Sequence, residues 1–159
     1  IFSDVPDKEH WAHEGIDYAV ANKLMNGVGG DKFNPGGTLT RAELVTILYR
    51  VEGSPEAAYK GTFKDVKEGQ WYTAAIEWAA ANEIVKGVGD GTNFDPSGII
   101  TREQIATILY RYTGEPKVEG DLNKFPDVKE ISSFAATAMN GAPRLHQDAR
   151  LNRLVQILP

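Results

Sequence analysis

The chain of 159 residues contains no cysteine, which excludes a disulfide framework, a thiolate zinc site and a cysteine nucleophile. Basic residues are in the minority: 17 Lys+Arg stand against 22 Asp+Glu, for a formal net charge of -5. An acidic chain offers no basic stripe to neutralise phosphates, so we expect no nucleic-acid partner. No apolar run approaches the roughly 20 residues that cross a bilayer, so we expect no membrane insertion.

Patterns for metals, nucleotides and catalysis are missing as well. His10 and His13 have no third partner at metal-binding spacing. An EF-hand loop opening at Asp90 would need its last ligand at Thr101, which is not acidic. The glycine-rich stretches follow helical patterns rather than strands and lack the lysine of a phosphate-binding loop. No combination of nucleophile, base and acid can be recognised in the sequence. From these missing patterns we expect no metal, no cofactor and no catalytic residue.

What is present is the composition of a globular domain, with 42% hydrophobic and 25% charged residues. The chain begins at Ile1, and we interpret it as a fragment of a longer protein. The sequence Phe-x-Asp-Val starts at residues 2, 63 and 125, at spacings of 61 and 62. Residues 11–50 and 71–111 share roughly 18 identities in about 40 aligned positions, which excludes chance similarity. The chain is therefore a tandem repeat with a period of about 60 residues.

The start of each complete unit has the spacing of an amphipathic helix. Apolar residues recur at helical intervals over residues 11–24 and again over 71–84. Gly27 and Gly87 follow where a glycine would end each helix. We expect the tryptophan that opens each span to lie in the core, with stacking on a bound ligand as the alternative.

A second helix starts in each unit with a capping box. Thr40 and Glu43 have the S/T-x-x-E spacing, and Thr101 and Gln104 have its glutamine variant. In this motif two side chains bind free amide groups of the first turn, so we expect these four residues to be structural caps. In the first unit the apolar face of this helix ends before Gly53.

Glycine-rich loops join the two helices at residues 27–37 and 87–98. Such loops adopt positive φ angles easily and let a ligand approach the main chain closely. Phe33 and Phe94 are expected to tie them to the core. Two short helices cannot cover their own apolar faces, so neighbouring units must pack against each other.

The third unit is incomplete. Phe134 stands at the tryptophan position, but Gly-Ala-Pro-Arg at residues 141–144 interrupts the helix. No glycine-rich loop and no Thr-Arg pair follow. Two accounts of residues 141–159 stay open: a shortened unit whose apolar segment 151–158 joins the common core, or a non-native tail. A missing helix would leave apolar surface that favours self-association.

The predicted architecture is all-α. It comprises repeat one at 1–53, a linker at 54–62, repeat two at 63–114, a linker at 115–124 and the incomplete repeat three at 125–159.

These motifs together resemble the surface layer homology (SLH) domain: Phe-x-Asp-Val, a tryptophan-led helix, Gly-Val-Gly-Asp-Gly-Thr-x-Phe-x-Pro and Thr-Arg-Ala-Glu. The resemblance covers residues 2–53 and 63–114 in full and 125–140 in part. It implies a pseudo-threefold helical assembly of three units and a non-catalytic role on the bacterial cell surface. The implied partner is an acidic, pyruvylated secondary cell-wall polysaccharide, bound in grooves between units.

The resemblance places the groove arginines at Arg41 and Arg102. An arginine in a first helical turn opposes the helix dipole, so each needs an anion nearby. In one account Asp4, Asp65 or a carboxylate of a neighbouring unit supplies it, and the arginines only staple together the repeats of a protein-interaction module. In the other an acidic sugar supplies it, through two parallel hydrogen bonds. The candidate ligand-binding residues are Asp4, Trp11, Gly29, Arg41, Asp65, Trp71, Gly89, Asp90, Gly91, Arg102 and Asp127.

Overall fold

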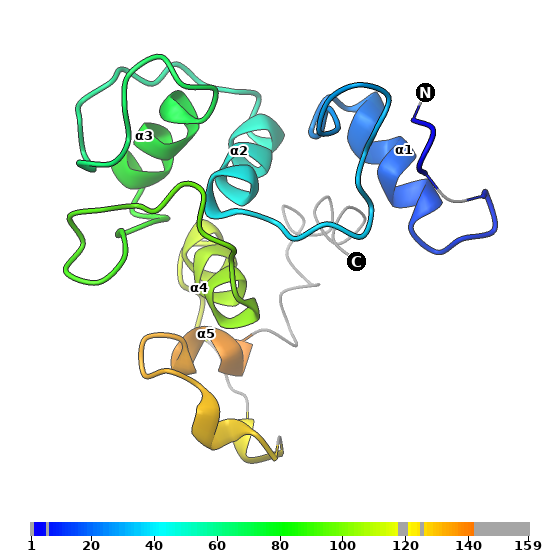
Figure 1. The fold of residues 1–159 in the computed structure, drawn as a ribbon. Coiled ribbons are helices and arrows are strands. Elements are labelled where there is room, and N and C mark those ends of the chain that lie inside the picture. The colour runs from blue at the N-terminus through cyan, green and yellow to red at the C-terminus, as the bar shows by residue number, and fades with distance from the viewer. Residues whose placement is uncertain (1, 6, 118–120, 125, 142–159) are drawn as a thin grey trace.

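The structure is a computed structural model, which describes residues 2–5, 7–117, 121–124 and 126–141. Within these residues the chain forms helices, with isolated bridges but no β-strand, which confirms the all-α prediction (Figure 1). Both accounts of residues 141–159 concern a segment that, apart from residue 141, lies outside the described residues, and closure of the predicted pseudo-threefold assembly stays a prediction. The elements are α1 (His13–Ala21), α2 (Arg41–Val51), α3 (Thr73–Ala81), α4 (Arg102–Tyr112), the 3-10 turns η1 (Leu122–Lys124) and η2 (Val128–Glu130), and α5 (Ala136–Gly141).

The first helix of each unit ends earlier than the glycines predict. The backbone turns at Lys23 and Glu83, with φ of 59° and 58°, so Gly27 and Gly87 lie beyond the helix. Asparagine holds each end: the side-chain amide of Asn22 donates to the carbonyl oxygen of Tyr18 at 2.8 Å, with the same bond in the second unit. The prediction of a glycine stop is wrong because non-glycine residues adopt the left-handed conformation here.

The expectation that the opening tryptophans lie in the core is also wrong. Trp11 is 70% exposed and Trp71 is 61% exposed. Both precede the first helical residue of their unit, so the helical repeat does not decide which way their side chains point. The buried tryptophan is Trp78, whose ring lies 5.7 Å from that of Tyr49.

The second helices begin where the capping boxes predict. The hydroxyl of Thr40 accepts from the amide of Glu43, and the Glu43 carboxylate accepts from the amide of Thr40 at 2.7 Å. Thr101 and Gln104 make the same pair of bonds at the start of α4. The four residues are therefore structural caps, as expected.

Each second helix packs against the first helix of the following unit. In this way α2 contacts α3, and α4 contacts α5 (Figure 1). Among the described residues α1 has no helix partner of comparable extent. The packing of α3, which α1 lacks, also changes which side chains are buried: four positions are buried in α3 but not at the equivalent places in α1. The pairs are Thr73/His13, Ala75/Gly15, Glu77/Asp17 and Trp78/Tyr18.

The loop of the second unit also covers the start of α2. The amide of Arg41 donates to the carbonyl oxygen of Gly98 at 2.9 Å, and the amide of Ala42 donates to that of Pro96 at 3.0 Å. In return the amide of Ile100 donates to Leu39. These bonds satisfy amides that a helix cannot pair internally, so the junction between units is part of the helix cap.

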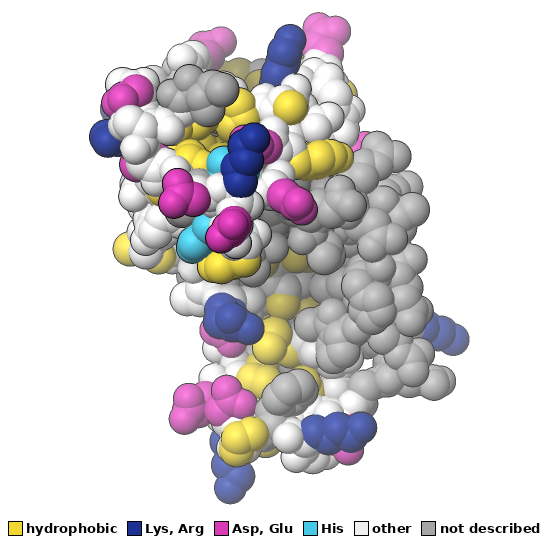
Figure 2. Space-filling model, turned by 90° about the vertical axis from the view of Figure 1, so that its right-hand side faces the viewer, with side chains coloured by type: hydrophobic (Ala, Val, Ile, Leu, Met, Phe, Trp, Pro, Cys, Tyr) yellow, Lys and Arg dark blue, Asp and Glu magenta, His cyan; other side chains and the backbone are white. Residues whose placement is uncertain are grey.

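The visible face in Figure 2 carries no block of one charge: Lys, Arg, Asp and Glu side chains are interspersed over its described part. Among the helices of the described residues, none has the length and apolar character needed to cross a membrane.

Candidate functional site

The repeat-opening aspartates shape the glycine-rich loops. The two carboxylate oxygens of Asp65 accept from the amides of Phe94 and Asp95, at 2.8 and 2.7 Å. Asp4 makes the equivalent bonds to the first loop, and the amide of Phe33 is the main cause of its lowered pKa. These bonds hold each loop phenylalanine in the core, where Phe94 is fully buried. The aspartates therefore act on the loop backbone rather than facing an open cavity.

The second loop turns tightly on itself. The amide of Val88 donates to the carbonyl oxygen of Asn93 at 2.8 Å. Gly87 has φ of 78°, and a Cβ there would lie 2.7 Å from the same oxygen, so no other residue fits. At Gly89 the position of a Cβ has no neighbour within 4 Å, which leaves the loop backbone open at that point. Asp90 is used locally, because its carboxylate accepts from the amide and hydroxyl of Thr92, which lowers its pKa.

Arg41 lies at the junction of the first two units and is only 6% exposed. Its Nε–H donates to the carbonyl oxygen of Phe94 at 2.7 Å, and its guanidinium carbon lies 4.8 Å from the centre of the Phe94 ring. Burial lowers the pKa of Arg41, whereas the charges of Asp95 and Asp65 raise it. Arginine keeps its proton through such shifts, so the junction holds a fixed positive charge.

Beside Arg41 the three units enclose a cavity of about 320 Å³, which we call the cationic pocket. The first unit contributes Arg41, the second contributes loop and α4 residues, and the third contributes Phe134. The described residues that line it are Arg41, Val85, Lys86, Gly87, Val88, Gly89, Gln104, Thr107, Ile108, Arg111 and Phe134.

The charged residues among the described lining of this pocket are all positive. Arg41, Lys86 and Arg111 line it, and no described aspartate or glutamate does. Within the described chain no hydrogen bond or ion pair is recorded for the Lys86 and Arg111 side chains. Arg50 stands at the position equivalent to Arg111 but donates to the carbonyl oxygen of Leu24 at 2.8 Å. The second unit therefore keeps a cation free that the first unit uses internally.

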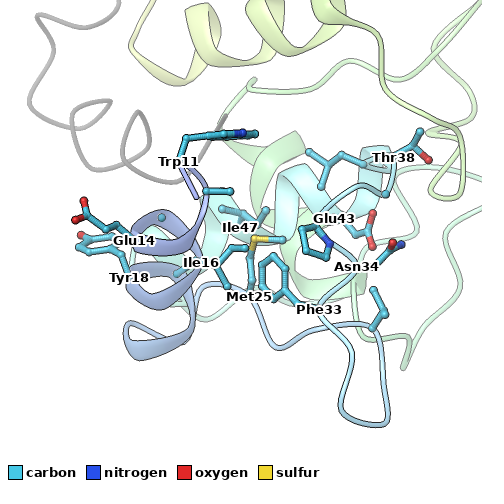
Figure 3. Close-up of a pocket in the computed structure, with 17 residues that line it drawn as sticks. Trp11, Glu14, Ile16, Tyr18, Met25, Phe33, Asn34, Thr38, Glu43 and Ile47 are labelled. Carbon is cyan, nitrogen blue, oxygen red and sulfur yellow. The ribbon is translucent and has the colours of Figure 1, made fainter. Parts of the chain in front are cut away.

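A larger cavity of about 700 Å³ lies between α1, the first loop and α2; we call it the apolar pocket (Figure 3). It uses positions of the first unit equivalent to several in the cationic pocket, with Glu43 in place of Gln104. Phe33, Met25 and Ile47 gather on one side of it in Figure 3. No described lysine or arginine lines it, and Glu14 adds a second carboxylate. Despite its size, this cavity has the wrong charge for an acidic ligand.

The structure brings only some of the predicted binding residues together. Arg41 and Gly89 line the cationic pocket, and Trp11 lines the apolar pocket. Arg102 is exposed and lines neither cavity. The remaining candidates, Asp4, Gly29, Asp65, Trp71, Asp90, Gly91 and Asp127, are also absent from both linings.

The residues of the cationic pocket that sequence analysis did not propose as ligand-binding include both of its other cations, Lys86 and Arg111, and its aromatic residue, Phe134. Arg111 had a signal, because it ends the repeated Thr-Ile-Leu-Tyr-Arg segment. The signal for Lys86 was weaker, because the equivalent residue of the first unit is Asn26 and the lysine is therefore not part of the repeat. Among the described residues no three His, Asp or Glu side chains are grouped to hold a metal ion.

Comparison with known proteins places the chain in a family. A sequence profile of the S-layer homology (SLH) domain matches residues 1–45 and 62–106. The chain is 33% identical over 148 residues to the exoglucanase XynX of Acetivibrio thermocellus, covering 91% of this chain and 13% of that protein. Against an amylopullulanase of Thermoanaerobacterium thermosulfurigenes the identity is also 33% over 148 residues, covering 91% and 8%. Against the S-layer protein sap of Bacillus anthracis it is 35% over 134 residues, covering 82% and 16%.

The chain belongs to the S-layer homology domain family. It is a cell-surface module of the kind that anchors proteins to the bacterial cell wall through its secondary polymers. The enzyme names among the relatives belong to proteins of which this chain spans 8% to 13%. The SLH domain itself is a non-catalytic anchor.

Proposed function

We propose that the chain anchors its parent protein by binding an acidic, pyruvylated secondary cell-wall polysaccharide in the cationic pocket. The observation that carries the proposal is the charge of this pocket, where three cations face a cavity that no described carboxylate lines. The chain as a whole is acidic, with a formal net charge of -5. A concentration of positive charge in an acidic protein favours a local anionic ligand.

The three cations contribute in different ways. Arg111 and Lys86 have donors that no described residue uses, so both can bind a carboxylate directly. A guanidinium binds a carboxylate with two parallel hydrogen bonds, whereas lysine acts as a point charge. Arg41 is committed through Nε to Phe94 and supplies a fixed charge at the pocket wall. The open backbone at Gly89 gives the ligand access to the loop.

The second predicted groove arginine, Arg102, has a different status. Arg41 is enclosed by the loop of the following unit, but the described part of the third unit has no such loop beside Arg102. We therefore place one competent site at the cationic pocket and keep a contact between Arg102 and the glycan as a separate proposal.

A protein-interaction repeat is the second candidate function, and the bond from Arg41 to Phe94 favours it, because it staples two units together. The two candidates differ at Arg111, which lines the pocket without stapling units. Glycan binding needs the Arg111 charge, whereas stapling needs only Arg41.

Co-sedimentation with purified bacterial cell-wall sacculi tests the proposal. We expect Arg111→Ala and Lys86→Ala each to weaken binding by about 1.5–3 kcal/mol, the range for hydrogen bonds to charged groups. Lys67→Ala is the matched control, because this exposed lysine lines neither cavity. Mild acid treatment that removes pyruvate from the sacculi should abolish binding by the unmodified chain.

Two results would contradict the proposal. One is unchanged sedimentation with sacculi after removal of pyruvate. The other is unchanged binding in both Arg111→Ala and Lys86→Ala while circular dichroism reports an intact fold. A loss of binding in Arg102→Ala alone would move the site to the start of α4.

A further inference from the structure

Among the described residues of the third unit, one side chain lines the cationic pocket, and that side chain is aromatic. Phe134 lines the pocket while remaining 52% exposed. Trp71 holds the equivalent position in the second unit and is 61% exposed, but it lines neither cavity. Exposure alone therefore does not place this position beside a pocket, and the placement of Phe134 needs its own cause.

Phe134 is positioned by contacts between α4 and the third unit. The amide and hydroxyl of Ser132 donate to the two carboxylate oxygens of Glu103, each at 3.0 Å. Ala135 and Ala138 are 0% and 2% exposed, and α5 packs against α4. The backbone is thus anchored on both sides of Phe134: two hydrogen bonds anchor the residues before it, and buried alanines anchor the residues after it.

The same helix carries the charged wall of the pocket. Arg111 lies on α4 together with Thr107 and Ile108, all of which line the cavity. Because Ser132 and α5 are bonded to or packed against α4, the backbones that carry Phe134 and Arg111 are linked. The pocket therefore has a charged region and an aromatic region carried by elements that pack together.

The combination of cations and an aromatic ring favours some anions over others. An inorganic anion needs only the cations, and gains nothing from Phe134, Val85 or Val88. A sugar that carries a carboxylate has a charged substituent and a ring face of C–H groups, and aromatic rings bury such apolar faces favourably. A cavity of about 320 Å³ is at the lower end of ligand-pocket volumes, which suits a single sugar residue.

We propose that Phe134 is the stacking platform of the cationic pocket, so that the incomplete third unit completes the ligand site of the second. In this arrangement the carboxylate of one acidic sugar faces Arg111, Lys86 and Arg41, and its ring packs on Phe134. The third unit is then required for binding even though it has no Thr-Arg pair and no glycine-rich loop of its own. The inference rests on the proposed function, because it assumes an acidic sugar in this pocket.

Two small probes separate stacking from charge: a methyl hexopyranoside carrying a pyruvate ketal, and pyruvate alone. Their affinities are measured by nuclear magnetic resonance titration of the full chain. We expect Phe134→Ala and Phe134→Leu to weaken the glycoside by about threefold to tenfold, the range for aromatic contacts, and to leave pyruvate unchanged. Phe134→Trp should retain glycoside binding. Ile99→Ala is the control, because this exposed apolar side chain lines neither cavity, and it should change neither affinity.

Arg111→Ala distinguishes failure of this inference from failure of the proposed function. If Arg111→Ala weakens both probes but Phe134→Leu weakens neither, the platform is overturned and the acidic-ligand site stands. If Arg111→Ala changes the affinity for neither probe, the proposed function is overturned, and this inference is overturned with it. Equal weakening of glycoside and pyruvate in Phe134→Leu also overturns the platform, because loss of stacking cannot affect a ligand without a ring. Phe134→Leu keeps most of the apolar side chain, and its thermal unfolding midpoint confirms the fold.

Discussion

The Nε–H of Arg41 donates to the carbonyl oxygen of Phe94 at 2.7 Å, across the junction between the first and second units. The same guanidinium lies over the Phe94 ring and lines the cationic pocket. One side chain therefore links the stability of the junction to the charge of the proposed glycan site. A substitution of Arg41 should therefore change both the stability of the chain and its binding to the glycan.

Arg41→Ala should lower the free energy of unfolding by about 1.5–3 kcal/mol, because it removes a charged donor from a buried carbonyl group. It should also weaken binding to cell-wall sacculi. Urea unfolding followed by circular dichroism measures the first effect, and co-sedimentation measures the second. Arg41→Lys, which keeps the charge but not the planar donor group, should recover more binding than stability. Unchanged stability in Arg41→Ala would contradict the role of this bond at the junction.

Glu77 should make stability depend on pH in the acid range. It is 4% exposed, and its carboxylate accepts from the amide and hydroxyl of Thr62 at 3.2 and 2.5 Å. Burial raises the pKa of Glu77, but hydrogen bonds from Thr62, Lys60 and Gly61 outweigh it and hold the pKa below its ordinary value of 4.5. A depressed folded pKa adds stability that is fully present above the unfolded pKa and is lost as pH falls through the folded value.

Glu77→Gln should therefore be less stable than the unmodified chain at pH 7, by roughly 1.5–3 kcal/mol. The difference should shrink as the pH falls below about 4.5, where the unmodified chain loses the charge. Chemical unfolding at several pH values between 3 and 7 measures how the free energy of unfolding depends on pH in the unmodified chain and in the variant. Parallel curves over this range would show that Glu77 does not contribute through its charge.

Gly87→Ala and Gly89→Ala form a matched pair in the second loop. Both residues have positive φ, at 78° and 56°. A Cβ at Gly87 would also lie 2.7 and 2.8 Å from the carbonyl oxygens of Asn93 and Gly91, whereas a Cβ at Gly89 would meet nothing within 4 Å. We expect Gly89→Ala to cost about 1–2 kcal/mol of strain and Gly87→Ala to cost clearly more. Equal thermal unfolding midpoints for the two variants would contradict the close approach at Gly87.

Thr40→Ala should destabilise the chain by about 1 kcal/mol, since it removes the hydroxyl that accepts from the Glu43 amide. Thr101→Ala removes the equivalent cap from α4 and should cost a similar amount. Thr40→Ser, which keeps the accepting oxygen, is the control and should restore most of the loss. Helix content and urea midpoints measure these effects, and a full loss in Thr40→Ser would rule out capping as the cause.

Self-association, predicted from the incomplete third unit, is tested by sedimentation velocity. Among the described residues α1 lacks a helix partner like those of α3 and α5, and the apolar pocket opens beside it. Since exposed apolar surface favours association, we expect the weight-average sedimentation coefficient to rise with protein concentration. A coefficient independent of concentration would contradict the prediction.

Local sequence predicted the starts of the second helices and the loop anchors correctly. The capping boxes at Thr40 and Thr101 involve residues three apart, so their bonds depend on little beyond the local backbone. Phe33 and Phe94 are buried as expected, because each is the large apolar residue of a polar loop. Helix ends were less predictable, since the turn at Lys23 needs a left-handed non-glycine residue that composition does not reveal.

The sequence by itself determined that the chain repeats, that each unit joins two helices through a glycine-rich loop, and that arginine opens each second helix. Only the tertiary structure decided that the two arginines differ: Arg41 is 6% exposed at a junction, whereas Arg102 is exposed. The physical reason is that the burial of an arginine depends on what packs over the helix start. The second loop packs over Arg41, and within the described residues no equivalent loop packs over Arg102.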